Sequence, residues 1–79
     1  MAVTDAIKAH LDTRGLMCPE PLIRTREALR SLRPGERLEI LSDDPVAPLD
    51  FAVFCDRTGN PLRDSSKEGK VYRFVIEHK

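Results

Sequence analysis

The stretch CPEPLIRTREALRSL (residues 18–32) places a cysteine directly before a helix start that is framed by two prolines. Proline and an acidic residue suit the first turn of a helix, because the backbone N–H groups there need no partner within the helix. The residues that follow have the composition and period of a helix, so Cys18 is expected at its N-terminus. The partial positive charge of that end favours a thiolate over a thiol. The sequence therefore predicts a reactive Cys18; the alternative is a small capping or packing residue.

The rest of the chain divides into short elements separated by turn signals. Residues 10–14 alternate apolar or β-branched side chains with polar ones, which is typical of a strand. Residues 33–36 (RPGE) stop the helix, and a second strand is predicted over residues 37–42. A second helix is predicted through residues 49–55, with Pro48 in its first turn and an Asp of the Asp43-Asp44-Pro45 turn as its cap. Residues 62–66 and 71–78 form a hairpin closed at residues 67–70.

This element order, β-α-β-α-β-β, restricts the topology. Crossover connections between parallel strands are right-handed, so both helices should cover one face of a four-stranded mixed sheet. The sequence thus predicts an α/β fold, a two-layer sandwich. We expect residues 1–8 to be a loose leader and residues 9–79 to form a single domain.

The first helix has two distinct faces. A rotation of about 100° per residue gathers five residues on the core side: Leu22, Thr25, Ala28, Leu29 and Leu32. Ile23 falls outside this set and lies on a flank with Arg26, Glu27 and Arg30, one turn beyond Cys18. Because Arg26 and Arg30 are like charges four residues apart, they mildly destabilise an isolated helix. We interpret the flank as a docking edge for a partner; the alternative is an ordinary solvated surface.

Size and charge narrow the classes of function. The chain has 79 residues, 13 Lys+Arg and 13 Asp+Glu, with a formal net charge of zero. A domain this small favours docking onto a partner over enclosing a substrate, and the balanced charge lacks the electrostatic footprint of a nucleic-acid-binding protein. We find no apolar run of the roughly 18 residues that span a bilayer, and no secretion signal. We therefore expect a cytoplasmic protein, monomeric when free, with Cys18 and Cys55 as free thiols.

The expected activation of Cys18 is moderate. A thiol with a pKa of about 8.5 is only about 3% ionised at neutral pH. A helix end worth about 1–2 kcal/mol would lower that pKa by about one unit, and Arg14 would add to the effect if it reaches the sulfur. His10 and His78 are remote in sequence, so no general base can be assigned. Cys18 is therefore better suited to exchanging sulfur with a partner than to hydrolysis.

The segment LDTRGLMCPEPL (residues 11–22) resembles the signature of the TusA (SirA-like) sulfur carrier family, a Cys-Pro-x-Pro motif after an L-D-x-x-G-L segment. The similarity continues through RPGE (33–36), SDDP (42–45), FC (54–55) and VYRFVI (71–76), so it covers residues 10–78. Ala52 departs from the family, in which proline is common at this place. That departure concerns the second helix more than the sulfur chemistry.

The resemblance implies a sulfurtransferase-like carrier that forms a persulfide on Cys18 and uses no cofactor and no metal. In the family, this cysteine accepts a sulfane sulfur from a cysteine desulfurase or another persulfide donor. It passes the sulfur to an acceptor protein, toward tRNA 2-thiouridine synthesis or in sulfur trafficking and oxidation, without direct contact with nucleic acid or membrane. Carried over to this chain, the supporting motif residues are Gly15, Pro19, Glu20 and Pro21. The partner-docking residues are Arg14, Met17, Ile23, Arg26 and Arg30.

Three other interpretations stay open. A redox pair of Cys18 and Cys55 would make a thiol-disulfide protein, although the two lie in separate predicted helices and the apolar neighbours of Cys55 favour a buried, structural role. A metal site from His10, Cys18, Cys55 and His78 would lack the paired spacing of zinc modules. In a non-catalytic interaction module, Cys18 would be a bystander.

Overall fold

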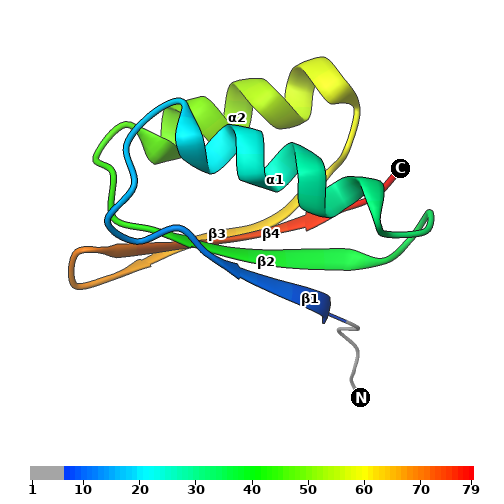
Figure 1. Cartoon of the computed structure of the whole chain (residues 1–79), viewed down its shortest axis with the longest axis horizontal. Coiled ribbons are helices and arrows are strands. Elements are labelled where there is room, and N and C mark those ends of the chain that lie inside the picture. Colours follow the sequence, from blue (N-terminus) through cyan, green and yellow to red (C-terminus); the bar gives the residue numbers. More distant parts are fainter. Residues whose placement is uncertain (1–6) are drawn as a thin grey trace.

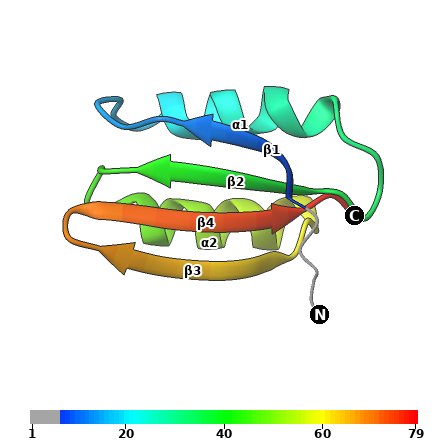
Figure 2. The same ribbon diagram turned by 90° about the horizontal axis from the view of Figure 1, so that it is seen from below.

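The computed structural model describes residues 7–79, which form a single sheet covered by two helices (Figure 1). The elements in chain order are β1 (Ile7–Asp12), α1 (Glu20–Arg30), β2 (Arg37–Ser42), α2 (Ala47–Thr58), β3 (Leu62–Glu68) and β4 (Val71–Glu77). The strand order is β1-β2-β4-β3, with β1 parallel to β2 and β4 antiparallel to both of its neighbours. Seen from below, the sheet lies in front of both helices (Figure 2). The predicted two-layer α/β sandwich is confirmed.

The hydrophobic core lies between the helices and the two central strands. Its fully buried side chains include Leu38 and Ile40 from β2, Phe51 from α2, and Phe74 and Ile76 from β4. The rings of Phe51 and Phe74 stack with their centroids 4.6 Å apart, which joins α2 directly to the sheet. The predicted core face of α1 is confirmed at Thr25 and Leu29, which are buried, whereas Leu22 and Ala28 are half-buried. Leu32 is also buried, although α1 ends before it, at Arg30.

Several element boundaries differ from those expected. Strand β1 begins at Ile7, so Ile7 and Lys8 belong to the sheet and not to a leader; residues 1–6 lie outside the described part of the chain. Helix α2 is longer than the stretch 49–55, because it starts at Ala47 and continues to Thr58. It ends where Gly59 adopts a left-handed φ of 79°. Strand β3 continues to Glu68, which pairs with Val71, so the hairpin turn is shorter than residues 67–70.

The face of the sheet that the helices leave open is covered by paired charges. Glu39 accepts a hydrogen bond from Arg73 and pairs with His10 at 2.7 Å, and Arg73 also reaches Asp64 at 2.9 Å. A second group joins Glu77 to Arg37 at 3.2 Å and to Arg63 at 3.0 Å. The three phenylalanines are buried and the single tyrosine, Tyr72, packs against the core. This face therefore lacks the exposed aromatic platform on which sheet domains stack nucleic-acid bases.

Candidate functional site: an exposed thiol beside an interhelical groove

Cys18 lies on the loop that joins β1 to α1, and its side chain is exposed. Pro19 is the N-cap of α1 and Glu20 is its first residue, so the sequence placed the cysteine correctly, just before the helix. The peptide bond between Cys18 and Pro19 is cis. Both helices begin at the same end of the molecule, so the Cys18 loop lies beside the first turn of α2 as well as that of α1 (Figure 1).

The start of this loop is anchored to strand β2. Thr13 is fully buried and donates twice to the carbonyl of Leu41, from its backbone N–H (2.8 Å) and from Oγ1 (2.6 Å). Gly15 then takes a φ of 86°, a conformation that side chains other than that of glycine rarely adopt. These features turn the chain away from the sheet and lift the following residues toward the helical layer. Gly15 is therefore expected to support the site through the conformation of its backbone, which turns the loop toward the helices.

Two aspartates of the β2–α2 turn hold the same loop from the other side. Asp43 Oδ1 accepts a hydrogen bond from the Gly15 N–H at 3.0 Å. Asp44 is buried; its Oδ2 accepts from the Cys18 N–H at 3.0 Å and its Oδ1 from the Val46 N–H at 3.1 Å. The expectation that Asp43 or Asp44 is the N-cap of α2 is therefore wrong in detail. The N-cap is Val46, and no side chain forms a capping hydrogen bond there. Asp44 instead joins the two loops that precede the helices.

The charges around Cys18 contradict the expectation that its thiol pKa is lowered. The pKa of the Cys18 thiol is raised, first because the Asp50 carboxylate accepts its hydrogen bond, then by partial desolvation and by the negative charges of Asp50 and Asp44. Arg14 does not offset these charges, because its guanidinium forms a double hydrogen bond with Asp12 at 2.7 and 2.9 Å. In the free protein, the thiol form of Cys18 is therefore favoured.

The start of α1 explains why the helix end does not overcome this effect. An anion at a helix N-terminus is stabilised mainly by free backbone N–H groups. Pro19 and Pro21 have no N–H group, and the N–H of Glu20 donates to the Met17 carbonyl at 2.9 Å. The prolines that mark the helix start thus also remove donors that a sulfur anion would use.

Cys55 lies in a different environment from Cys18. It is buried on the core face of α2, and desolvation raises the pKa of its thiol to about 11. Such a thiol is almost entirely protonated at neutral pH, which makes it a poor attacking group for disulfide exchange. The structure therefore favours the packing role of Cys55 over a redox pair. Within residues 7–79, no three metal-ligating side chains come together, so His10, Cys18, Cys55 and His78 form no such cluster.

Exposed apolar side chains gather on the elements around Cys18. Met17 and Ile23, both expected to contact partners, are 74% and 47% exposed. Helix α2 and its N-cap add three more, which we did not identify from the sequence: Val46, Leu49 and Val53, which are 50%, 67% and 43% exposed. These three residues are spaced three and four positions apart and lie off the core positions of α2, and this pattern could have indicated an exposed apolar stripe. The pattern was hard to recognise in the sequence because α2 has apolar residues on both its buried and its exposed side.

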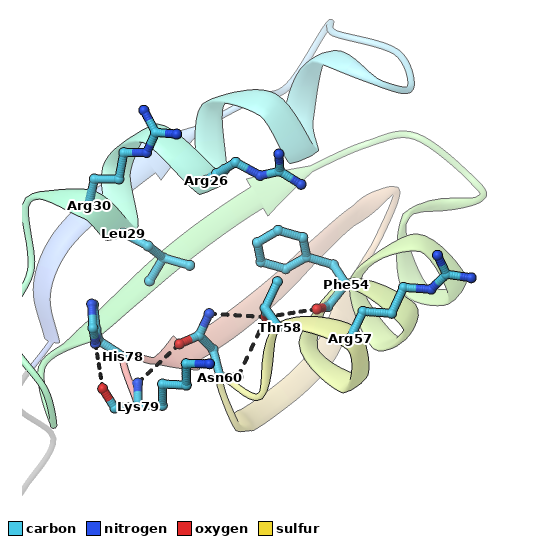
Figure 3. A pocket seen from close by; sticks show the side chains of 9 residues that line it. All are labelled: Arg26, Leu29, Arg30, Phe54, Arg57, Thr58, Asn60, His78 and Lys79. Atoms are coloured by element: carbon cyan, nitrogen blue, oxygen red, sulfur yellow. Dashed lines mark hydrogen bonds between the residues drawn. The ribbon is translucent and has the colours of Figure 1, made fainter.

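A groove runs between α1 and α2 from the Cys18 end to the far end of the helices. Its first part, of about 420 Å³, is lined chiefly by Pro19, Leu22, Ile23 and Phe54. Its second part, of about 400 Å³, has Arg26 and Arg30 on the α1 side and Arg57 on the α2 side, with Phe54 between them (Figure 3). Arg26, Arg30 and Phe54 line both parts, so the two parts adjoin.

Fold and site together define a small thiol protein, an α/β domain that holds one exposed cysteine on an anchored loop beside a groove. The chain belongs to the TusA family, because residues 9–78 match the family described as sulfurtransferase TusA. This match confirms the resemblance of the sequence to the TusA family, and with it the sulfurtransferase class. Within residues 7–79, neither helix is long and apolar enough to cross a membrane.

Individual relatives agree with this assignment. A protein of Neisseria meningitidis (serogroup A), which carries the provisional name of a sulfur carrier protein, is 42% identical over 69 residues, covering 87% of this chain and 93% of its own. The sulfur carrier protein TusA of Allochromatium vinosum is 37% identical over 68 residues, covering 86% and 90%. The crystal structure of a SirA-like protein from Desulfitobacterium hafniense superposes with a TM-score of 0.77 at 24% identity, covering 87% and 95%, which shows the common fold.

Proposed function

We propose that this protein carries sulfur as a persulfide on Cys18, receiving it from one protein and delivering it to another. The observation that carries the proposal is the exposure of the Cys18 thiol on a loop anchored by Asp43 and Asp44, in a chain of the TusA family. A sulfur atom that passes directly between two proteins needs an accessible acceptor whose backbone is held in place.

The transfer is an exchange without net oxidation. The Cys18 thiolate attacks the outer sulfur of a donor persulfide, the S–S bond of the donor breaks, and the donor cysteine leaves as a thiolate. The new S–S bond lies between Cys18 and the transferred sulfur. In the second step, a nucleophile of the acceptor attacks the outer sulfur and Cys18 leaves as a thiolate.

The raised pKa of Cys18 places a condition on the first step. Since Asp50 raises the pKa of Cys18 in the free carrier, we expect binding of the donor to increase the share of the attacking thiolate. A cationic group of the donor near Asp50 would lower the pKa of Cys18 and so increase its reactivity.

The donor in this proposal is a cysteine desulfurase or another persulfide protein, and the acceptor is a relay protein. From the acceptor, the sulfur goes either to tRNA 2-thiouridine synthesis or to sulfur trafficking and oxidation. In this proposal the chain itself does not contact nucleic acid. A cytoplasmic location agrees with two unpaired cysteines, and a monomeric free carrier agrees with a docking surface that both partners use in turn. The name of the Allochromatium vinosum relative supports the carrier role.

The test is incubation with a cysteine desulfurase and cysteine, followed by intact-mass measurement. We expect one added sulfur that a reductant removes, its loss in Cys18→Ser, and its retention in Cys55→Ser. A sulfur found on Cys55, or none on a folded protein with any desulfurase tried, would contradict the proposal. If Cys18→Ser keeps both partner binding and pathway activity, the protein is an interaction module.

A further inference from the structure

The arginines of this chain fall into two groups according to whether they are paired. Five of them form ion pairs with carboxylates, namely Arg14, Arg24, Arg37, Arg63 and Arg73. The other four, Arg26, Arg30, Arg33 and Arg57, have no carboxylate partner within residues 7–79, and three of these line the groove between α1 and α2. The groove therefore holds three of the four unpaired arginines of the described chain.

These three arginines come from two helices and line the same part of the groove. Figure 3 shows Arg26 and Arg30 on α1 and Arg57 on α2, on either side of Phe54. Glu27, which lines the part nearer Cys18, is the one carboxylate side chain of the described residues on either part of the groove. Like charges held close together repel, and a bound anion removes that repulsion. The open sheet face offers no such site, because its arginines are already paired.

The charge along the groove changes sign with distance from Cys18. Acidic side chains surround the Cys18 end, where Asp44 and Asp50 raise the pKa of the thiol and Glu20 begins α1. An apolar stretch formed by Leu22 and Ile23 follows, and the arginines come last. An occupant whose acidic groups extended to Cys18 would be repelled there, so its acids have to lie some distance from the sulfur.

From this arrangement we propose that the groove binds an extended segment of the partner protein, whose sulfur-bearing cysteine meets Cys18 and whose acidic side chains lie about three to five residues away. The separation follows from helix geometry, since Arg26 and Arg30 lie about 10 and 16 Å along the axis from Pro19 and an extended chain covers about 3.3 Å per residue. One apolar side chain of the segment occupies the stretch at Leu22 and Ile23. This inference rests on the proposed sulfur transfer and specifies the chemistry of its partner.

A protein segment fits the groove better than a nucleic acid does. The arginines are preceded by an apolar stretch that suits a side chain, and the acidic Cys18 end opposes a continuous phosphate backbone. Phe54, the one aromatic residue in the groove, is only 7% exposed and offers no stacking surface.

The test measures capture of synthetic probes by Cys18 through disulfide exchange. Each probe peptide carries one terminal cysteine as a mixed disulfide with 2-mercaptoethanol, a short spacer with one leucine, and then a run of glutamates. A matched probe carries glutamines, and both are made with the cysteine at either end. Capture releases 2-mercaptoethanol and joins the peptide to Cys18, so no sulfur donor is needed. The ratio of glutamate to glutamine capture cancels any change in the reactivity of Cys18.

At low salt we expect the glutamate probe to be captured about tenfold more favourably, since three exposed ion pairs of ordinary strength add to that ratio. The ratio should fall below about threefold in Arg57→Glu and by a smaller amount in Arg57→Gln. It should stay unchanged in the control Arg33→Glu, which changes the net charge as much as Arg57→Glu does but at a position outside the groove. Circular dichroism confirms that each variant is folded.

Equal capture of both probes by the wild-type protein, or an equal loss in Arg33→Glu, would overturn the inference. The inference would also be overturned if a decauridylate that carries the same mixed disulfide were captured better than the glutamate probe, since the groove would then prefer a nucleic acid. Because the capture uses no persulfide, these results are separate from the mass measurement of sulfur on Cys18. A protein that forms the persulfide but shows no preference for glutamate would keep the proposed function and lose this inference.

Discussion

The buried carboxylate of Asp44 accepts a hydrogen bond from the Cys18 N–H at 3.0 Å, across 26 positions of the sequence. Its second oxygen accepts from the N–H of Val46, at the start of α2. One side chain thus sets the position of Cys18 relative to the helix that provides Asp50. The geometry of the site depends on this link, and its removal should affect both stability and sulfur transfer.

Asp44→Asn tests the link. An amide provides one acceptor oxygen where the carboxylate provides two, so one backbone N–H loses its partner. We expect a loss of about 1–3 kcal/mol in the free energy of unfolding, measured with urea. Hydrogen exchange at the Cys18 amide should become faster, and sulfur transfer slower. Asp43→Asn is the control: Asp43 is exposed and an amide oxygen can still accept from Gly15. Equal effects of the two substitutions would contradict the role assigned to Asp44.

Asp50→Asn should increase the reactivity of Cys18. The carboxylate of Asp50 is the first cause of the raised thiol pKa, so its removal lowers that pKa. More thiolate is then present at any pH below the pKa, and each unit of decrease speeds alkylation by iodoacetamide about three- to fourfold, because the lower basicity offsets part of the gain. The pH profile of the alkylation rate should shift to lower pH. Asp56→Asn, on an exposed position of the same helix, should leave the profile in place; an equal shift would refute the specific effect of Asp50.

Cys55 should stay unreactive in the folded protein. With its pKa at about 11, only about one molecule in a thousand carries the thiolate at pH 8. Mass spectrometry after iodoacetamide treatment should therefore find one modified cysteine in the native protein and two in urea. The native modification should disappear in Cys18→Ser. Rapid labelling of Cys55 in the native state would reopen the thiol-disulfide interpretation.

The ion pairs on the open sheet face should give a defined acid dependence. Hydrogen bonds from His10 and Arg73 lower the pKa of Glu39 below its ordinary value of 4.5. A carboxylate with a lowered pKa stabilises the fold above the unfolded pKa, and that contribution disappears as the pH falls through the folded pKa. Glu39→Gln should therefore cost about 0.5–1 kcal/mol near pH 7, with the difference from wild type shrinking below about pH 4.5.

Urea unfolding at several pH values measures this difference. Glu68→Gln is the control, because Glu68 is exposed and forms no ion pair within the described residues. A loss for Glu39→Gln that is the same at pH 3 and pH 7 would instead mean that packing, and not charge, is responsible.

The sequence predicted the parts of this protein that short-range physics controls. The prolines around Glu20 marked the start of α1 and so placed Cys18, and helical periodicity identified the buried positions at Thr25 and Leu29. The element order then restricted the topology, because crossover connections have one handedness. Boundaries were less certain: β1 starts at Ile7 and α2 at Ala47 because pairing with β2 and packing on the sheet extend them beyond their local signals.

The expectation about the chemistry of Cys18 was wrong in sign for a definite reason. A helix end is a local feature, so its effect on the thiol could be anticipated from residues 18–21. The carboxylates that decide the pKa come from Asp44 and Asp50, in the turn before α2 and in its first turn. Likewise, the groove combines Arg26 and Arg30 with Arg57 of the other helix.

The sequence by itself therefore determined which elements form and where the thiol lies along the chain. Only the tertiary structure decided which charges surround the thiol and which arginines line the same groove. The physical reason is that helix and turn signals act between residues a few positions apart. Coulomb interactions and hydrogen bonds depend on distance in space, which the fold sets.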